Sequence, residues 1–213
     1  KPFTTLLSPT HIRKDLYGSF YETHLNEIPE RLRDILRAYL PDEGPPELPL
    51  RERYLTRRFG PAFASLKRIV LTGMGSAHHA GLMAKNLFME AMPDVDVLAL
   101  QPVEIDDIEL EIVPEQDLVV LVSWSSTTAD MVQLAIDLRD RNVAVVGVTE
   151  KVYSDMALLA HNSGGVIPTL SGEEVTVSGL KSIVCMFHVL CLLALWMTDR
   201  RGRELTAGDI PDR

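Results

Sequence analysis

The chain has 213 residues, of which 46% are hydrophobic and 24% are charged, and its formal net charge at pH 7 is -9. This length and composition are typical of a soluble globular protein with one full domain, or with one domain and an additional arm. The acidic charge argues against general nucleic-acid binding, which needs basic surface, but backbone N–H groups can still hold a small phosphorylated ligand.

The first part of the chain is predicted to be helical. Apolar residues at helical spacing between positions 19 and 40 predict a helix, and Pro29 is expected to open a second one, because proline suits the first helical position. A proline-rich breaker at 41–49 and a short charged helix at 50–59 follow. Residues 1–15 contain no sustained apolar core, so no signal peptide is expected and a cytoplasmic location is predicted.

From residue 67 onward, short apolar strands alternate with helices. Strands are predicted at 68–76 (with its glycine turn), 94–100, 117–123, 144–149 and 164–170, and helices at 77–92, 128–142, 153–162 and 175–197. This alternation predicts an α/β fold, a flavodoxin-like three-layer αβα sandwich with a five-stranded parallel sheet, preceded by an N-terminal helical arm. The expected division is arm and linker at 1–66, the α/β domain at 67–198, and a polar tail or linker start at 199–213.

The most apolar segment, residues 182–197, is shorter than the ~20 residues that a bilayer requires and contains His188. We therefore expect no membrane contact and a helix buried on nearly all sides, by the sheet or by another subunit. His188 is expected to be a core histidine that donates to a carbonyl. Cys185 and Cys191 face different directions on this helix and are expected to be free thiols in a reducing compartment.

Two turns carry candidate ligand-binding residues: 73–77 after the first strand, and the hydroxyl-rich 123–128 after the third. In open parallel sheets, ligands bind beyond the carboxyl ends of the strands, near the point where strand order reverses. The first turn is not a dinucleotide fingerprint, because His78 stands where a third glycine is needed. The second combines hydroxyl donors with a helix start, which suits a phosphate monoester. The alternative is that Ser126 or Thr127 only caps the helix.

Residues 68–196 resemble the SIS domain, the sugar-isomerase fold of phosphosugar isomerases and phosphosugar-responsive regulators. Three segments carry the resemblance: GMGSAHHAG at 73–81, SWSSTTAD at 123–130 and GEEVTVSGLKSIVC at 172–185. Within the family the similarity is to the first SIS half of the isomerase part of glucosamine-6-phosphate synthase, and residues 21–36 resemble the segment before that half. The chain departs from the family pattern at six positions: Ala77, Trp124, Ser126, Thr127, Gly179 and Leu180.

The resemblance implies that the hydroxyls of Ser123, Ser125 and Thr128 hold a phosphate. The residues predicted to contact a sugar phosphate are Gly75, Ser76, Ser123, Trp124, Ser125, Ser126, Thr128, Val177 and Lys181. The expected ligand is similar to fructose 6-phosphate or glucosamine 6-phosphate, and neither a metal nor another cofactor is expected. Trp124 either covers the apolar face of the ligand or packs under the turn. Lys181 either anchors the ligand or pairs with Glu174.

Moving a proton between C1 and C2 of a sugar needs a base, and opening the ring needs an acid–base group. The candidates are Glu173, Glu174, His78 and His79. In the synthase the catalytic residues belong to the second SIS half, so no position here inherits them, and the catalytic set is unknown, with Glu174 and His78 as candidates. Glu174 can instead bond backbone N–H groups before the last helix. One of the two histidines is expected to face the ligand turn and the other solvent.

Three functions of different classes fit these observations. The chain is predicted to be a sugar-phosphate isomerase, or an aminotransferase- or deglycase-like enzyme, that acts on a ketose or amino-sugar 6-phosphate. The alternatives are a non-catalytic phosphosugar sensor and a structural half-domain that dimerises. Because the resemblance implies a site completed by a second SIS domain, we expect a homodimer or a pair of SIS domains in one longer chain.

Overall fold

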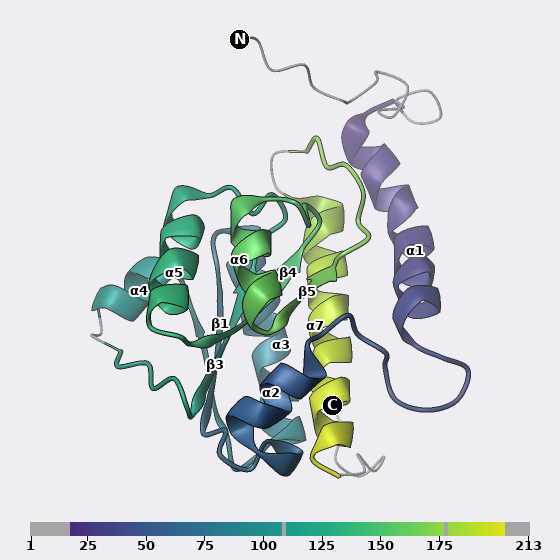
Figure 1. Ribbon diagram of the computed structural model, residues 1–213. Helices are drawn as coiled ribbons and strands as arrows, with labels where there is room; N and C mark the ends of the chain where they lie inside the picture. Colours follow the sequence, from purple (N-terminus) through teal and green to yellow (C-terminus); the bar gives the residue numbers. More distant parts are fainter. Residues whose placement is uncertain (1–17, 108–109, 177–178, 203–213) are drawn as a thin grey trace.

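The computed structural model describes residues 18–107, 110–176 and 179–202 (Figure 1). Its centre is one sheet of five strands: β1 (Arg68–Gly73), β2 (Asp96–Leu100), β3 (Asp117–Val122), β4 (Ala144–Thr149) and β5 (Gly165–Pro168). The strand order is β2-β1-β3-β4-β5, and all neighbouring strands run parallel. The prediction of a five-stranded parallel sheet is confirmed.

Helices cover both faces of the sheet. One face carries α3 (Ser76–Ala91) and α7 (Leu180–Arg200), and the other carries α4 (Pro102–Asp107), α5 (Ala129–Asp140) and α6 (Asp155–Ser163) (Figure 1). Successive strand residues point to opposite faces, so Ile69 and Leu71 pack with α3 and α7, whereas Val70 packs with α5 and α6. The three-layer αβα sandwich is therefore confirmed.

The described part of the N-terminal arm consists of α1 (Phe20–Tyr39), α2 (Glu52–Phe59) and a 3-10 turn (Pro61–Phe63). The helix α1 packs on the outer side of α7, whereas α2 lies near the C-terminal end of α7, where Glu52 pairs with Arg200 (Figure 1). The prediction that Pro29 opens a second helix is wrong, because α1 continues through it. Packing of α1 against α7 outweighs the one backbone hydrogen bond that proline cannot donate. Ile35 and Leu55 join the same apolar cluster as α3 and α7, so the arm is part of the core.

The helix α7 is the central helix of that apolar cluster. Its 21 residues are long and apolar enough to cross a membrane by length and composition alone, which the shorter segment 182–197 did not suggest. However, 61% of its most apolar window is buried inside the protein, so the helix is mostly buried, although not on nearly all sides as predicted. Burial also raises the pKa of the Cys185 thiol to about 12 and that of Cys191 to about 11, so both are inert thiols at neutral pH.

The order of the strands reverses between β1 and β3, because the chain runs outward from β1 to β2 and then returns to β3 on the other side. In the parallel register Gly73 lies beside Val122, so the two turns that follow these strands begin next to each other. The sheet thus brings both candidate ligand turns to its switch point, where open α/β sheets bind ligands.

Candidate functional site

A cavity of about 290 Å³ lies where the turn after β1, the turn after β3 and the loop before α7 meet. Its polar lining consists of six hydroxyl side chains and the carboxylate of Glu174. The hydroxyl residues are Ser76, Ser123, Ser125, Thr128, Thr176 and Ser182. No lysine, arginine or histidine is among the described residues that line it. The cavity therefore offers neutral hydrogen-bond donors and one negative charge.

The turn after β3 is held in shape by Ser126, which is fully buried and has a left-handed φ of 53°. Its hydroxyl donates to Thr149 Oγ1 (2.5 Å), and its N–H donates to Ser123 Oγ (3.0 Å). Thr149 in turn donates to the carbonyl of Trp124 (3.2 Å). Ser126 was predicted to contact the ligand, but it lies beneath the turn and does not line the cavity. Because Ser123 Oγ accepts a bond there, its own hydroxyl proton stays available to donate.

The helix α5 begins directly behind this turn, with Thr128 as its N-cap residue. The Thr128 side chain makes no capping hydrogen bond, and a helical bond runs from the N–H of Val132 to the carbonyl of Thr128 (3.0 Å). The alternative that Ser126 or Thr127 only caps the helix is therefore wrong. The amide groups of the first helical turn have no acceptor within the helix and carry partial positive charge. Together with the hydroxyls around them, they can hold an anion without a cationic side chain.

The turn after β1 forms a second part of the cavity. Gly75, predicted to contact the ligand, is the N-cap residue of α3 with a φ of 55° and does not itself line the cavity, whereas Ser76 at the start of α3 does. Gly179, before α7, approaches so closely that a Cβ atom there would lie 3.1 Å from Ser76 Oγ. This contact brings the starts of α3 and α7 together. Thr176, Gly179 and Ser182 were not predicted as site residues. Their position directly before a long helix, or in its first turn, was the sequence signal that could have indicated them.

Trp124 connects the turn after β3 to the loop before α7. Its Nε1 donates to the carbonyl of Gly172 (3.2 Å), and Lys151 Nζ lies 4.8 Å from the ring centroid. Lys151 also pairs with Glu173 (Nζ to Oε1, 2.5 Å). The indole lines the cavity and is fixed by its neighbours, which makes it a rigid wall of the site.

Glu174 lies in the loop before α7, and its carboxylate reaches the first turn of that helix. Its Oε2 accepts bonds from the backbone N–H groups of Lys181 (2.8 Å) and Ser182 (2.9 Å), and its side chain is 4% exposed. The alternative in which Glu174 bonds backbone N–H groups before the last helix is therefore what the structure shows. Lys181 does not line the cavity, and its Nζ pairs with Glu27 on α1 (2.5 Å) rather than with the carboxylate of Glu174.

The predicted histidines lie outside the cavity. His79 is exposed and its Nδ1 lies 2.8 Å from the carbonyl oxygen of Gly75, while His78 is half-buried with an Nδ1 that has no partner among the described residues. Nε2 of His188 is also buried without a partner there, so the expected bond from this nitrogen to a carbonyl is not found, and burial lowers the pKa of His188. Val177 lies outside the described residues. Within those residues, no cluster of three or more His, Cys, Asp or Glu side chains could hold a metal ion.

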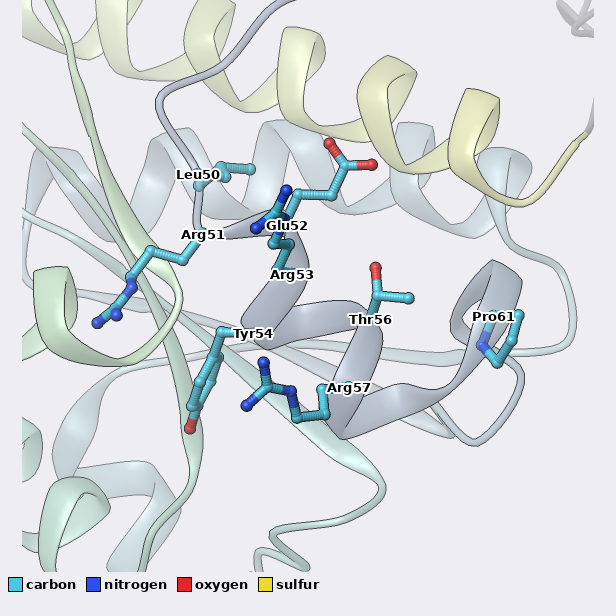
Figure 2. Close-up of a pocket in the computed structure, with 8 residues that line it drawn as sticks. All are labelled: Leu50, Arg51, Glu52, Arg53, Tyr54, Thr56, Arg57 and Pro61. Atoms are coloured by element: carbon cyan, nitrogen blue, oxygen red, sulfur yellow. The ribbon is translucent and has the colours of Figure 1, made fainter.

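A larger open groove of about 1120 Å³ runs along α2 (Figure 2). Leu50 forms a bridge with Gly165, the first residue of β5, so this groove lies toward the amino ends of the strands. Figure 2 shows the side chains of Arg51, Arg53 and Arg57 pointing in different directions, and they do not converge on one point. The cavity at the switch point is therefore the better candidate for a specific site.

Comparison with known proteins places the chain in a family. The family model of the SIS domain matches residues 62–195. Glutamine–fructose-6-phosphate aminotransferase [isomerizing] of Symbiobacterium thermophilum is 30% identical over 200 residues, which are 92% of this chain and 30% of that protein. The chain therefore spans about a third of the length of the curated relatives that it matches.

Solved structures share this fold. The C-terminal domain of glucosamine-fructose-6-phosphate aminotransferase from Francisella tularensis has a TM-score of 0.76 at 22% identity, covering 92% of this chain and 52% of that one. The sugar isomerase domain of the RpiR transcription factor from Sphaerobacter thermophilus has a TM-score of 0.57 at 15% identity, covering 85% of this chain and 92% of that one. The predicted resemblance to the SIS domain and to the isomerase part of the synthase is confirmed.

Proposed function

The chain belongs to the SIS domain family, and on that premise we propose that it binds a sugar phosphate in the cavity beyond β1 and β3. One observation carries the proposal: the hydroxyl residues Ser123, Ser125 and Thr128 line one cavity together, directly before α5. A phosphate monoester accepts several hydrogen bonds at once, so hydroxyl and amide donors around the positive end of a helix favour it.

The sugar extends from this phosphate position toward Trp124, Glu174 and Thr176, which line the same cavity. The indole of Trp124 covers an apolar face of the sugar, and the polar side chains meet its hydroxyl or amino groups. The volume of about 290 Å³ lies at the small end of the range of about 300–1,000 Å³ that ligand pockets span. A single sugar phosphate such as fructose 6-phosphate or glucosamine 6-phosphate is of suitable size.

The reaction we propose is that of an isomerase or an aminotransferase-like enzyme whose acid–base groups come partly from a second SIS unit. Glu174 is already engaged at Oε2 by two amides and at Oε1 by the hydroxyl of Thr176. No other carboxylate and no histidine lines the cavity among the described residues. A homodimer, or a second SIS domain in a longer chain, supplies the groups that move the proton.

Ligand titration tests the binding proposal. Fructose 6-phosphate, glucosamine 6-phosphate and inorganic phosphate are added to the protein, and tryptophan fluorescence and the melting temperature are followed together. We expect saturable binding, with the Ser125→Ala variant weakened about tenfold or more, because a hydrogen bond to a charged group is lost. Thr127→Ala is the matched control, since Thr127 is exposed and does not line the cavity. Absence of binding by folded protein, or equal losses in both variants, contradicts the proposal.

Proton exchange distinguishes an enzyme from a sensor. Fructose 6-phosphate is incubated with the protein in D₂O, and deuterium incorporation at C1 is followed by NMR, because an aldose–ketose isomerase exchanges this proton with solvent. Incorporation that disappears in Ser125→Ala supports an enzyme. Binding without incorporation means that this chain alone does not supply the acid–base groups, as expected for a sensor or for a chain that needs a second SIS domain. Neither binding nor incorporation leaves the structural half-domain.

A further inference from the structure

The inward face of α1 changes character along its length. Near the C-terminal end it is apolar, with Ile35 and Tyr39 buried, but near the N-terminal end it presents His24 and Glu27. The His24 side chain is 7% exposed and that of Glu27 is 33% exposed. Polar groups are costly to bury unless they find partners. Figure 1 shows this end of α1 at the same end of the molecule as the start of α7.

His24 bonds to the loop that forms the wall of the cavity. Its Nε2 accepts a bond from the backbone N–H of Val175 (3.2 Å), and its Nδ1 lies 3.4 Å from Oε2 of Glu27. These partners fit the neutral ring, in which Nδ1 carries the proton and Nε2 accepts. Oε1 of Glu174 lies 3.5 Å from the same Nε2, so the ring also packs against the carboxylate that lines the cavity.

Glu27 forms the second connection. Its Oε2 lies 2.5 Å from Nζ of Lys181, which is 2% exposed and also donates to the carbonyl of Glu173 (2.9 Å). The backbone N–H of Lys181 donates to Glu174, so one residue of α7 connects the arm to both neighbouring glutamates. Four side chains, which we call the arm network, form this cluster: His24, Glu27, Glu174 and Lys181.

We propose that His24 and Glu27 are positioning residues, through which α1 sets Glu174 and the neighbouring wall of the cavity in place for the sugar. The inference rests on the proposed function, since it assigns these residues to the sugar side of the same site. The phosphate side has additional supports of its own, because Ser126 and Thr149 hold the turn after β3, and only the bond from Trp124 to Gly172 joins that turn to the loop before α7 among the bonds described above. Groups that orient a substrate need such supporting contacts, because a small displacement is enough to lower affinity or rate.

The two sides of the site allow a specific test. Removing an arm contact moves the wall at Glu174 but leaves the phosphate turn unchanged. We therefore expect His24→Leu to weaken fructose 6-phosphate about tenfold, because one buried hydrogen bond is lost, and to leave inorganic phosphate unchanged. His24→Gln restores most of the affinity, since its amide oxygen can accept from the N–H of Val175. Asn26→Ala on the exposed face of α1 is the matched control.

Amide hydrogen exchange without ligand provides an independent readout. We expect the N–H of Val175 to exchange faster in His24→Leu than in the unchanged protein and in His24→Gln, because its acceptor is lost. If His24→Leu does not fold, Glu27→Gln, which removes the ion pair with Lys181 Nζ, carries the comparison of fructose 6-phosphate and inorganic phosphate affinities instead. Unchanged exchange, or equal losses for the sugar phosphate and for phosphate, overturns the inference. If the unchanged protein binds no sugar phosphate, the proposed function fails, and exchange alone then decides whether the arm holds the wall.

Discussion

At the scale of single residues, two glycines in the first strand–helix unit have opposite packing requirements. Gly73 ends β1 where two strands and a helix meet, and a Cβ atom there would lie 2.7 Å from the carbonyl oxygen of Val122. Gly81 lies inside α3, and the nearest atom to a Cβ there would be Leu71 Cβ at 3.5 Å, an ordinary contact. The space around each glycine therefore decides whether an added methyl group lowers the stability of the fold.

We expect Gly73→Ala to lower the free energy of unfolding by about 1–3 kcal/mol, because the methyl group forces the turn away from β3. Gly81→Ala should be neutral or should raise it by up to about 1 kcal/mol, because alanine favours a helix interior. Urea denaturation of both variants measures the difference. If Gly73→Ala were no less stable than Gly81→Ala, the turn after β1 would not be close-packed.

Which hydroxyl residues face the cavity could be predicted only in part. Ser123, Ser125 and Thr128 line it as the family resemblance implied, whereas Ser126 lies beneath the turn. Its left-handed backbone directs its hydroxyl to Thr149 on a neighbouring strand, and no local pattern reveals such a conformation in a serine. Lys181 also falls on a family position, but its partner Glu27 is distant in the sequence and could not be inferred locally.

At the scale of elements, α1 is attached to the domain at both ends. Near its C-terminal end the hydroxyl of Tyr39 donates to the carbonyl of Pro168 on β5 (2.8 Å). Burial, with a smaller contribution from the charge of Glu150, raises the pKa of Tyr39, so the phenol stays protonated and can donate. The opposite end is held by the arm network. A helix outside the α/β sandwich is thus fixed by polar contacts at its ends and by apolar packing between them.

We expect Tyr39→Phe to lower the free energy of unfolding by about 1 kcal/mol, because the carbonyl of Pro168 loses its donor while the ring still packs. Tyr21→Phe on the same helix is the control, since Tyr21 is 53% exposed and should change little. Chemical denaturation of both variants measures the effect. No difference between them would mean that water replaces the hydroxyl at no cost.

The elements themselves could largely be predicted, because alternating apolar strands and amphipathic helices are strong local signals. Two exceptions have physical reasons. Pro29 lies inside α1, where packing against α7 outweighs the preference of proline for a helix start. The short helix α4 was missed because six residues cannot display a helical period.

At the scale of the whole molecule, the arm and the domain are joined by a partly buried ion pair. Burial raises the pKa of the Glu27 carboxyl. The hydrogen bond and charge of Lys181, together with His24, lower this pKa by more than burial raises it, so that it lies below its ordinary value of 4.5. A carboxyl with a lowered pKa stabilises the folded state above its ordinary pKa. This stabilisation is lost as the pH falls through the lowered value.

We therefore expect Glu27→Gln to be less stable than the unchanged protein at pH 7, and the difference to shrink as the pH falls below about 4.5. Melting temperatures measured from pH 7 to pH 3 provide the test. Glu30→Gln, which alters an exposed carboxylate on the same helix, should show no such dependence. A difference that stays constant with pH would mean that Glu27 contributes through packing rather than charge.

No cationic side chain lines the cavity within the part of the chain that the structure describes, and this has a kinetic consequence for a chain with a net charge of -9. A phosphate dianion approaching such a protein meets long-range repulsion, which slows its encounter with the site, and it is attracted only within hydrogen-bonding distance. Affinity in this arrangement is determined mainly by the time that the ligand stays bound rather than by the frequency of its arrival. Discrimination among small anions then depends on how many of the neutral donors each one satisfies.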